Sequence, residues 1–567
     1  MSEQRGMIIA IVLSTLILFV FHFFSEQNTI EEMKKNEPEI AGYVNNVASP
    51  AQEPTLTRED ALNLSERVQI KTRKLSGSIN TTGAMIDDIS LENYKENMAA
   101  DSANVKLLNP AGTNEASYIS LCWRSAAKSE GELNDNTLPD EKTKWNVVET
   151  PPENQLIKLA YTTAKGVAFE RTISLDDNYM ISVTDRVINN SEQELKICQC
   201  GEIARAAAFS TNKRIASSVF EGGIGNFDKN MREISFEKLE GKDSATQCIK
   251  DVISNGWVGF TDKYWLTSLI IKDTNPVKVN IEKDANLMKC TTTTGEILIK
   301  PGETVEYKNL IFVGAKELGV LEGYGKTHGI DKFDLSIDFG WLYLLTKPLF
   351  YLLQALFSFL GNMALAIILL TLLSKVALFP FARKSNLSMA KMKSLQPKLE
   401  RLKLLYGDNK IRMNEEMLKL YRSEKVNPAS GCLPLLIQMP IFFCLYKVFS
   451  ISIGLRHAPL FLWIKDLAAP DPSSLFNLFG LLPWAPPQFL QIGILHILMG
   501  ATMFWQQRIS PQPTDNSQAK MMMYFMPLSF VFMFTIFPVP SGLLLYWTTS
   551  NILAIVQQLF MTPRNAA

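Results

Sequence analysis

Hydrophobic and polar residues are distributed differently in the two halves of this chain. Residues 25–338 mix polar and apolar positions, whereas residues 339–561 consist of long apolar runs interrupted by one stretch rich in Lys and Arg. A helix that crosses a bilayer needs about 20 mostly apolar residues, a length that several of these runs approach. The pattern therefore predicts a membrane α-helical bundle joined to a large soluble domain.

The first apolar run, residues 7–24, follows a short N-terminal segment that carries Arg5. A cleaved signal peptide has a shorter apolar core and an Ala-x-Ala-like cleavage site. Polar residues beginning at Ser25 follow here instead, so we expect residues 1–24 to form a retained signal-anchor helix. Residues 25–60 are polar and poor in aromatic side chains, a composition typical of a flexible tether.

Residues 61–330 show the alternation of polar and apolar positions that half-buried strands produce. The alternation is clearest in residues 67–91, 167–190 and 277–314, and turn residues such as Pro301-Gly302 separate the runs. Many short strands joined by turns indicate an all-β sandwich of two packed sheets. We find no Gly-rich phosphate loop or nucleophile elbow there, so we interpret this domain as a folding, docking or spacing module.

The apolar stretch that opens the second half is about twice as long as one span requires. Lys347-Pro348 and Gly361-Asn362 interrupt it. We therefore expect an interfacial amphipathic helix at residues 339–360 and a true span at residues 362–380. A single long, tilted helix is the alternative.

Lys and Arg are concentrated in residues 383–426, which follow Pro380. Met and Leu recur there at helical spacing, which predicts two helices, residues 385–405 and 410–424, packed as a hairpin. Short cytoplasmic loops carry an excess of Lys and Arg, so we place this hairpin in the cytoplasm. Its methionines either pack the two helices together or form an adaptable binding surface.

The remaining apolar runs predict four more spans. The residues between the first two of them are rich in Pro and Trp, as in a loop at the outer interface. With the signal anchor, six transmembrane helices place both termini in the cytoplasm and residues 25–338 outside. The four spans are residues 432–452, 489–507, 521–537 and 541–561, and the loop is residues 453–488.

Lys375 is the one cation in the span at residues 362–380, and none of the predicted spans contains Asp or Glu. A charge at the centre of a span costs about 2.5–3.5 kcal/mol on insertion scales. Lys375 either reaches back to the cytoplasmic interface or faces a hydrated cavity in the bundle. Because Cα–Cβ bonds tilt toward a helix N-terminus, its side chain starts away from cytoplasmic water. Thr371 lies one turn earlier, and Gln438 and residues 548–551 either add polarity or bond between helices.

Other polar groups in the apolar half carry less information. We expect Lys447 to reach the outer interface and His496 to be a hydrogen-bonded core residue. The spans contain no Ser/His/Asp or HExxH arrangement, so we expect no catalytic residues.

Charge and cysteine content narrow the function further. The 57 basic and 57 acidic residues cancel, so we expect no nucleic-acid partner. Seven cysteines cannot all pair, and Cys198 and Cys200 have no further ligand nearby in the sequence. We therefore expect no metal site and no cofactor, and interpret this CxC as structural or adventitious.

Four motifs resemble one known family. SMAKMKSLQPKLERLK, EKVNPASGCLPLLIQMPIFFCLY, FLWIKDLAAPDP and VPSGLLLYWTTSNILAIVQQ are similar to the YidC family of bacterial membrane protein insertases, which are related to the mitochondrial and chloroplast Oxa and Albino proteins. The resemblance covers nearly all of residues 330–561. The signal anchor and the large β-domain further resemble the Gram-negative form.

The resemblance implies an insertase and chaperone in the bacterial inner membrane, with residues 25–338 in the periplasm. It implies a hydrophilic groove that is open to cytoplasm and lipid and closed to the outside, with Lys375 where relatives usually have Arg. Relatives often have Tyr at the position of Trp547. The residues at matching groove positions are Lys375, Thr371, Gln438, Phe442, Tyr546 and Trp547.

The resemblance also implies partners: nascent integral membrane proteins, the Sec translocon, the ribosome, the signal recognition pathway and the lipid bilayer. The C-terminal tail is short and has one Arg, which makes the basic hairpin the candidate for docking a ribosome or client. Its candidate residues are Lys391, Lys393, Lys398, Arg401 and Lys403.

The alternatives are a secondary transporter with a ligand-binding periplasmic domain and a membrane hydrolase. Ion-coupled carriers commonly use intramembrane carboxylates and inverted repeats, and we identify neither in the sequence. A ligand-binding role of the β-domain by itself stays open.

Overall fold

The computed structural model describes most of the chain. The expected signal anchor and residues 25–55 of the expected tether lie outside the described residues. The described residues are 56–99, 101–126, 138–149, 156–207, 219–240, 248–406, 409–424, 426, 433–460, 463–482, 484, 486–509, 517–537 and 539–561.

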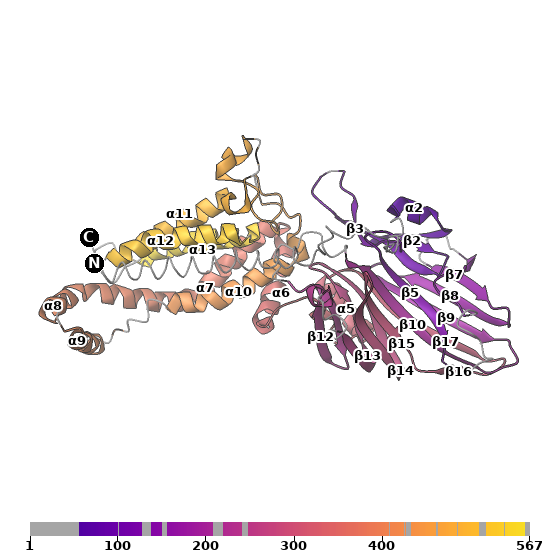
Figure 1. Cartoon of the computed structure of the whole chain (residues 1–567). Helices are drawn as coiled ribbons and strands as arrows, with labels where there is room; N and C mark the ends of the chain where they lie inside the picture. The colour runs from indigo at the N-terminus through magenta and orange to yellow at the C-terminus, as the bar shows by residue number, and fades with distance from the viewer. Residues whose placement is uncertain are drawn as a thin grey trace, which may run out of the picture.

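The chain forms two bodies, a β-domain and a helical bundle, which Figure 1 shows end to end. Short helices α2 (Arg58–Asn63) and α4 (Phe236–Glu240) belong to the β-domain. Its strands are β1 (Arg67–Lys71), β2 (Leu75–Asn80), β3 (Met85–Lys95), β4 (Asn104–Leu108), β5 (Ser117–Ser125), β6 (Asn146–Glu149), β7 (Leu156–Thr162), β8 (Val167–Leu175), β9 (Met180–Asn189), β10 (Leu195–Ala206), β11 (Gly222–Phe227), β12 (Asn230–Ser235), β13 (Ile249–Thr261), β14 (Trp265–Asp284), β15 (Leu287–Thr293), β16 (Ile297–Ile299) and β17 (Thr304–Ala315).

The long strand β14 joins two antiparallel layers. Residues 265–270 of β14 pair with β17, and residues 278–284 pair with β15. From β17 one layer continues through β9, β8, β7 and β6. From β15 the other layer continues through β10, β5, β3, β2 and β1.

A buried core holds the two layers together. Trp123 of β5 packs on Phe169 of β8, with ring centroids 6.1 Å apart, and its Nε1 donates to Asp185 of β9 at 2.9 Å. Asp185 also receives two hydrogen bonds of 2.7 Å from Arg171, whose remaining guanidinium nitrogen donates to Leu121 O at 3.0 Å. A charge buried this deeply requires a full set of partners, which this arrangement supplies. The predicted all-β sandwich is confirmed.

One part of the expected tether is structured. Thr57 caps α2, and Arg58 forms an ion pair with Asp88 and donates to Leu108 O at 3.2 Å. The prediction of a flexible tether extending to residue 60 is therefore wrong at its C-terminal end. Composition alone could not show that Arg58 has partners on β3 and at the end of β4.

The helices after the β-domain begin near its junction with the bundle, and those from α6 onward build the bundle and its extension. In chain order they are α5 (Leu318–Thr327), η2 (Phe333–Ser336), α6 (Tyr343–Leu360), α7 (Met363–Ser394), α8 (Gln396–Tyr406), α9 (Lys410–Ser423), α10 (Leu433–Ile451), η4 (Ile453–Leu455), η5 (Leu475–Gly480), η6 (Gln488–Leu490), α11 (Ile494–Ile509), α12 (Ser517–Ile536) and α13 (Ser541–Met561).

Helices α6 and α7 are separate. Gly361 ends α6 in the left-handed conformation (φ 65°), which a glycine adopts without a Cβ clash. A single long helix through this region, the alternative reading, is wrong. Lys347 of α6 forms ion pairs with Asp334 at 2.7 Å and Glu322 at 3.1 Å, which tie α6 to the end of the β-domain.

The sequence predicted a helix that ends at Pro380. Helix α7 does not end there. It continues to Ser394 with Pro380 inside it, so the expected helix at residues 385–405 is split between α7 and α8. A proline in a helix removes a hydrogen bond and clashes with the preceding turn. Pro380 and Val376, one turn earlier, both lie on an exposed face, so the proline ring and the missing hydrogen bond disturb no packed neighbour.

Three helices of the described chain are long and apolar enough to cross a membrane: Tyr343–Leu360, Met363–Met389 and Ser541–Phe560. Two shorter apolar helices cover Ile437–Ile451 and Tyr524–Ile536. The first of the three is α6 itself, for which the sequence predicted a position in the interface. Length and composition therefore permit either placement of α6.

Candidate functional site: a polar cavity in the helical bundle

A cavity of about 350 Å³ lies among α7, α10, α11, α12 and α13. Its lining comes from residues 375–389 of α7, 437–438 of α10, 503–507 of α11, 526–530 of α12 and 546–558 of α13. These segments form the half of the bundle that faces away from the β-domain, where α8 and α9 also lie (Figure 1). The cavity therefore belongs to the hairpin side of the bundle.

Helix α13 contributes a stripe of polar residues to the cavity. Tyr546, Ser550 and Gln557 line it, with Asn551 and Gln558 beside them. Steps of three and four residues along a helix keep side chains on one face. This spacing makes the stripe visible in the sequence. Gln557 and Gln558 are the members of the stripe that were not predicted.

Most of the polar side chains that line the cavity are carboxamides. Carboxamides donate and accept hydrogen bonds without carrying charge, and no carboxylate is among the lining residues. A volume of this size accommodates several waters or a short peptide segment. The seven lining carboxamides are Asn386, Gln438, Gln506, Gln507, Asn551, Gln557 and Gln558.

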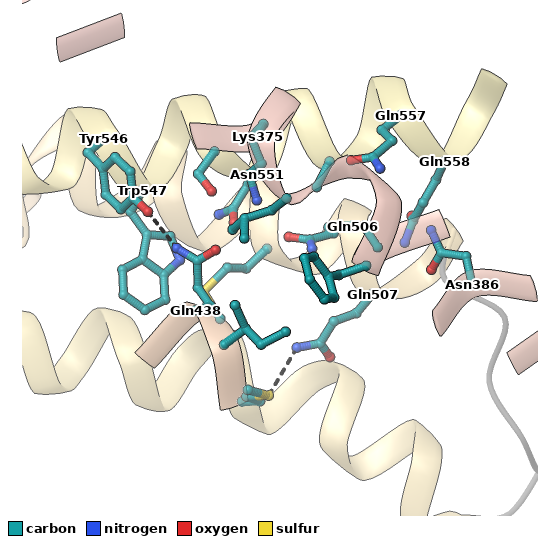
Figure 2. A pocket seen from close by; sticks show the side chains of 18 of the residues that line it. Lys375, Asn386, Gln438, Gln506, Gln507, Tyr546, Trp547, Asn551, Gln557 and Gln558 are labelled. Atoms are coloured by element: carbon teal, nitrogen blue, oxygen red, sulfur yellow. Dashed lines mark hydrogen bonds between the residues drawn. The ribbon is translucent and has the colours of Figure 1, made fainter. Parts of the chain in front are cut away.

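Lys375 is the cation of this cavity. Its side chain is partly exposed and lines the cavity wall. Figure 2 shows its ammonium end directed toward the interior, near Asn551. Asn551 donates to Thr502 at 3.2 Å. This geometry fits the second interpretation of Lys375, in which its side chain faces a cavity.

Gln438 and Tyr546 join α10 to α13 across the cavity wall. The Gln438 amide donates to the Tyr546 hydroxyl, and Figure 2 shows the bond beside Trp547. Tyr546 is buried, whereas Trp547 is partly exposed. The structure thus brings Lys375, Gln438, Tyr546 and Trp547 together around one space, as the sequence analysis expected.

Phe442 packs against aromatic residues of the cavity wall. It packs edge-on against Trp547, with ring centroids 4.9 Å apart, and also contacts Phe534 at 6.2 Å. Trp547 further contacts Phe530 at 5.4 Å. Phe442 is not among the lining residues, so it contributes to this cavity by packing against the wall.

Thr371, which the resemblance places at a groove position, does not line this cavity. It is fully buried, and its hydroxyl donates to Ile367 O of its own helix at 2.7 Å. The i−4 spacing correctly places it on the face of Lys375. That face enters the packed half of the bundle, where Ile367 and Leu370 are also buried.

The half of the bundle next to the β-domain is densely packed. Ala366, Val448, Phe449 and Leu544 are fully buried there. One apolar core extends from these residues into the β-domain. The described residues therefore close the cavity toward the β-domain.

The basic hairpin lies at the opposite end. Lys391, Lys398 and Arg401 are exposed, and Lys398 forms an ion pair of 2.5 Å with Glu424. The side chains of Lys393 and Lys403, also predicted as docking residues, lie outside the described residues.

The methionines near the hairpin have two different roles. Met392 packs with Leu395 and Val426, against Tyr421, so helix packing is confirmed for this residue. Met389 lines the cavity instead.

His496 is a hydrogen-bonded core residue, as expected. Its Nδ1 accepts from Gly493 N at 3.3 Å, and its Nε2 lies 3.3 Å from Phe534 O. A carbonyl only accepts, so Nε2 carries the proton and the imidazole is neutral. Nearby, Asp471 accepts from Trp463 Nε1 at 3.1 Å and from Leu495 N at 2.9 Å, which fixes the loop before α11.

Both bodies of the chain match models of known protein families. Residues 67–352 match the family model described as the YidC periplasmic domain, and residues 355–567 match that of the 60Kd inner membrane protein. The chain is 38% identical over 574 residues to the membrane protein insertase YidC of Rickettsia felis, covering 99% of each chain.

The chain belongs to the YidC family of membrane protein insertases. Its similarity to the family member from Rickettsia canadensis is 39% identity over 578 residues, covering 100% of each chain. A solved structure titled as an active YidC insertase with the first transmembrane domain resolved aligns with 17% identity and a TM-score of 0.36, covering 87% of this chain and 92% of that one. The β-sandwich is the part of the chain that matches the family model of the YidC periplasmic domain.

Proposed function

We propose that this protein inserts integral membrane proteins into the bacterial inner membrane and assists their folding. The observation that carries the proposal is the cavity in the hairpin-side half of the bundle, which combines one cation with seven carboxamides and has no carboxylate in its lining. The full-length identity to proteins named membrane protein insertase supports it.

In the proposed mechanism, Lys375 attracts the acidic or polar outer segment of an incoming protein. Coulomb attraction is several times stronger in a partly dehydrated cavity than in bulk water, which favours entry of an anionic segment. The carboxamides replace part of the hydration shell of that segment, and this lowers the cost of removing it from water. The apolar part of the client then moves into lipid. No covalent step, ATP or cofactor is required, so we propose that the protein is not an enzyme.

The proposed topology has six membrane spans: the signal anchor, α7, α10, α11, α12 and α13. Helix α6 lies in the outer interface, where exposed Trp341 and Leu344 contact lipid. The Lys- and Arg-rich hairpin then lies in the cytoplasm with both termini, and residues 25–338 lie in the periplasm. The packed half of the bundle separates the cavity from the periplasm.

We further propose that the basic hairpin receives clients from the ribosome or the signal recognition pathway, with Lys391, Lys398 and Arg401 exposed for contact. Lys393 and Lys403 belong to the same predicted surface. The Sec translocon is the proposed partner for larger clients.

Site-specific photocrosslinking during synthesis of a small single-span client tests this function. A photoreactive residue at Gln438 or Gln557, which line the cavity, should crosslink to the nascent span. The same residue at Thr371, which is buried outside the cavity, is the matched control and should not. Crosslinks from the two glutamine positions only to lipid or neighbouring helices would rule out the cavity as the insertion path.

The alternative of a secondary transporter is not favoured, because the cavity offers no acidic group for ion coupling. Ion-driven solute uptake by the purified protein in liposomes would support it instead.

A further inference from the structure

Three cysteines meet on one face of the periplasmic domain. Strands β5 and β10 are antiparallel neighbours, and Cys200 lies directly opposite Cys122. Cys198 is two residues before Cys200 on β10, so its side chain points to the same face. Cys122 and Cys198 are partly exposed, whereas Cys200 is buried, and all three are thiols in this structure. The CxC is visible in the sequence, whereas Cys122 is distant in the chain and joins it only in the folded domain.

Strand geometry selects one pair of the three. Directly opposite residues in an antiparallel pair have Cα atoms about 4.5–5.5 Å apart, within the roughly 4.4–6.8 Å that disulfides span. Cys122 and Cys198 form a diagonal pair, at about 7–8 Å, which lies beyond that range. The Cys198 thiol is directed to Arg124 O, at 3.7 Å. Cys198 and Cys200, two residues apart along one strand, are about 6.4–6.8 Å apart, at the upper limit of that range. Cys122 and Cys200 are therefore the pair whose spacing lies well within the disulfide range.

The surroundings of the pair give the two thiols different reactivity. A hydrogen bond from the Cys200 thiol, and then the positive charge of Arg124, lower the pKa of Cys122. Contacts with Cys122 and Cys198, followed by burial, raise the pKa of Cys200. The thiolate is the reactive form of cysteine. Cys122, which is also the more exposed of the pair, is therefore positioned to react first.

We propose that Cys122 and Cys200 form a reversible cross-strand disulfide in the periplasm, with Cys198 left as a thiol beside it. The periplasm is an oxidising compartment in which disulfides form and persist. This inference rests on the periplasmic assignment of the β-sandwich and is independent of the insertase mechanism.

The oxidant is a disulfide, such as the disulfide form of a thiol oxidase or oxidised glutathione. The Cys122 thiolate attacks one sulfur of the oxidant, forming a mixed disulfide and releasing the first oxidant thiol. The Cys200 thiolate then attacks Sγ of Cys122, forming the Cys122–Cys200 bond and releasing the second oxidant thiol. The two cysteines lose two electrons and two protons, and the oxidant disulfide takes them up as two thiols.

Thiol counting on the full-length protein in detergent tests the proposal. The protein is incubated with oxidised glutathione, denatured, and labelled with a maleimide that shifts its mobility on a gel. We expect two fewer labels than the seven of the reduced chain, and a linked peptide pair containing Cys122 and Cys200 in mass spectrometry. Seven labels after oxidation, or a linkage that uses Cys198, would overturn the proposal.

Single variants locate the bond. Cys122→Ser and Cys200→Ser should show the same number of labels before and after oxidation. Cys198→Ser should still lose two labels, as should the matched control Cys248→Ser, which lies outside the cluster. Loss of the linkage in Cys198→Ser would contradict the assignment. The wild-type peptide map decides the question even if a variant does not fold.

Discussion

The ammonium of Lys447 in α10 lies 2.5 Å from Oδ2 of Asp338, in the segment between η2 and α6. The same carboxylate oxygen accepts from Phe220 N of the β-domain at 2.8 Å, and Oδ1 accepts from Gly340 N at 3.1 Å. One carboxylate therefore connects the bundle, the periplasmic domain and the connecting segment. The sequence indicated only that Lys447 would reach the interface, because Asp338 is distant in the chain.

Replacing Lys447 with Met should weaken the connection between the two bodies. The variant leaves the partly buried Asp338 carboxylate without its cation, and hydrogen bonds to charged groups contribute about 1.5–3 kcal/mol. We expect faster hydrogen exchange in residues 337–342 and a lower thermal midpoint in detergent. Lys158→Met is the control, because its pair with Glu149 is about half exposed and such pairs contribute about 0–1 kcal/mol. Equal effects of the two variants would contradict this role of Lys447.

Lys316 should make the stability of the periplasmic domain depend on pH. It is buried, its ammonium donates to Thr261 at 2.9 Å, and burial lowers its pKa from 10.5 to about 8. Below pH 8 the folded and unfolded chains both carry the proton, whereas between about pH 8 and 10.5 only the unfolded chain carries it. Stability therefore rises with pH across this window.

Thermal unfolding of the periplasmic domain within the full-length protein, at pH 7.5 and pH 9.5, measures this effect. The contribution of Lys316 to the rise should be absent in Lys316→Met. The same pH dependence in wild type and variant would show that another group is responsible.

The charge of Lys375 should control insertion of clients with acidic outer segments. We expect Lys375→Arg to keep most of the insertion rate and Lys375→Gln to lower it roughly 5–30-fold, the factor that corresponds to one or two kcal/mol. Lys375→Glu should lower the rate further. A protease-protection assay of client insertion measures the rates, and a client with a neutral outer segment should be affected less. Lys158→Gln, in the β-domain and outside both the cavity and the basic hairpin, is the control. Normal insertion by Lys375→Gln would exclude the charge mechanism.

Trp547 should be needed for the stability of the cavity wall. Trp547→Ala removes the ring that contacts Phe442, Phe530 and Phe534. Removing a buried aromatic side chain costs about 3–5 kcal/mol, and the partial exposure of Trp547 places its cost near or below the lower end of that range. Denaturant unfolding in detergent, followed by tryptophan fluorescence, measures the loss. Trp505→Ala, at a position 53% exposed, should cost much less.

Patterns local in the chain determined the broad organisation of this protein. Alternating residues in strands such as β8 determined the β-sandwich, and the apolar runs determined the helices, because both depend on which face of an element is removed from water. Lys375 was recognisable for the same reason, since a cation in an apolar run needs a polar environment. Four motifs, one of them around Tyr546, carried the resemblance to the family.

Tertiary structure alone decided which of these residues meet. It extended α7 past Pro380, because the proline lies on an exposed face. It buried Thr371 and left Lys375, one turn later on the same face, lining the cavity, because the bundle is packed at one depth and hollow at the next. It also placed Cys122 opposite Cys200. Each outcome depends on packing between segments far apart in the chain, which local periodicity does not specify.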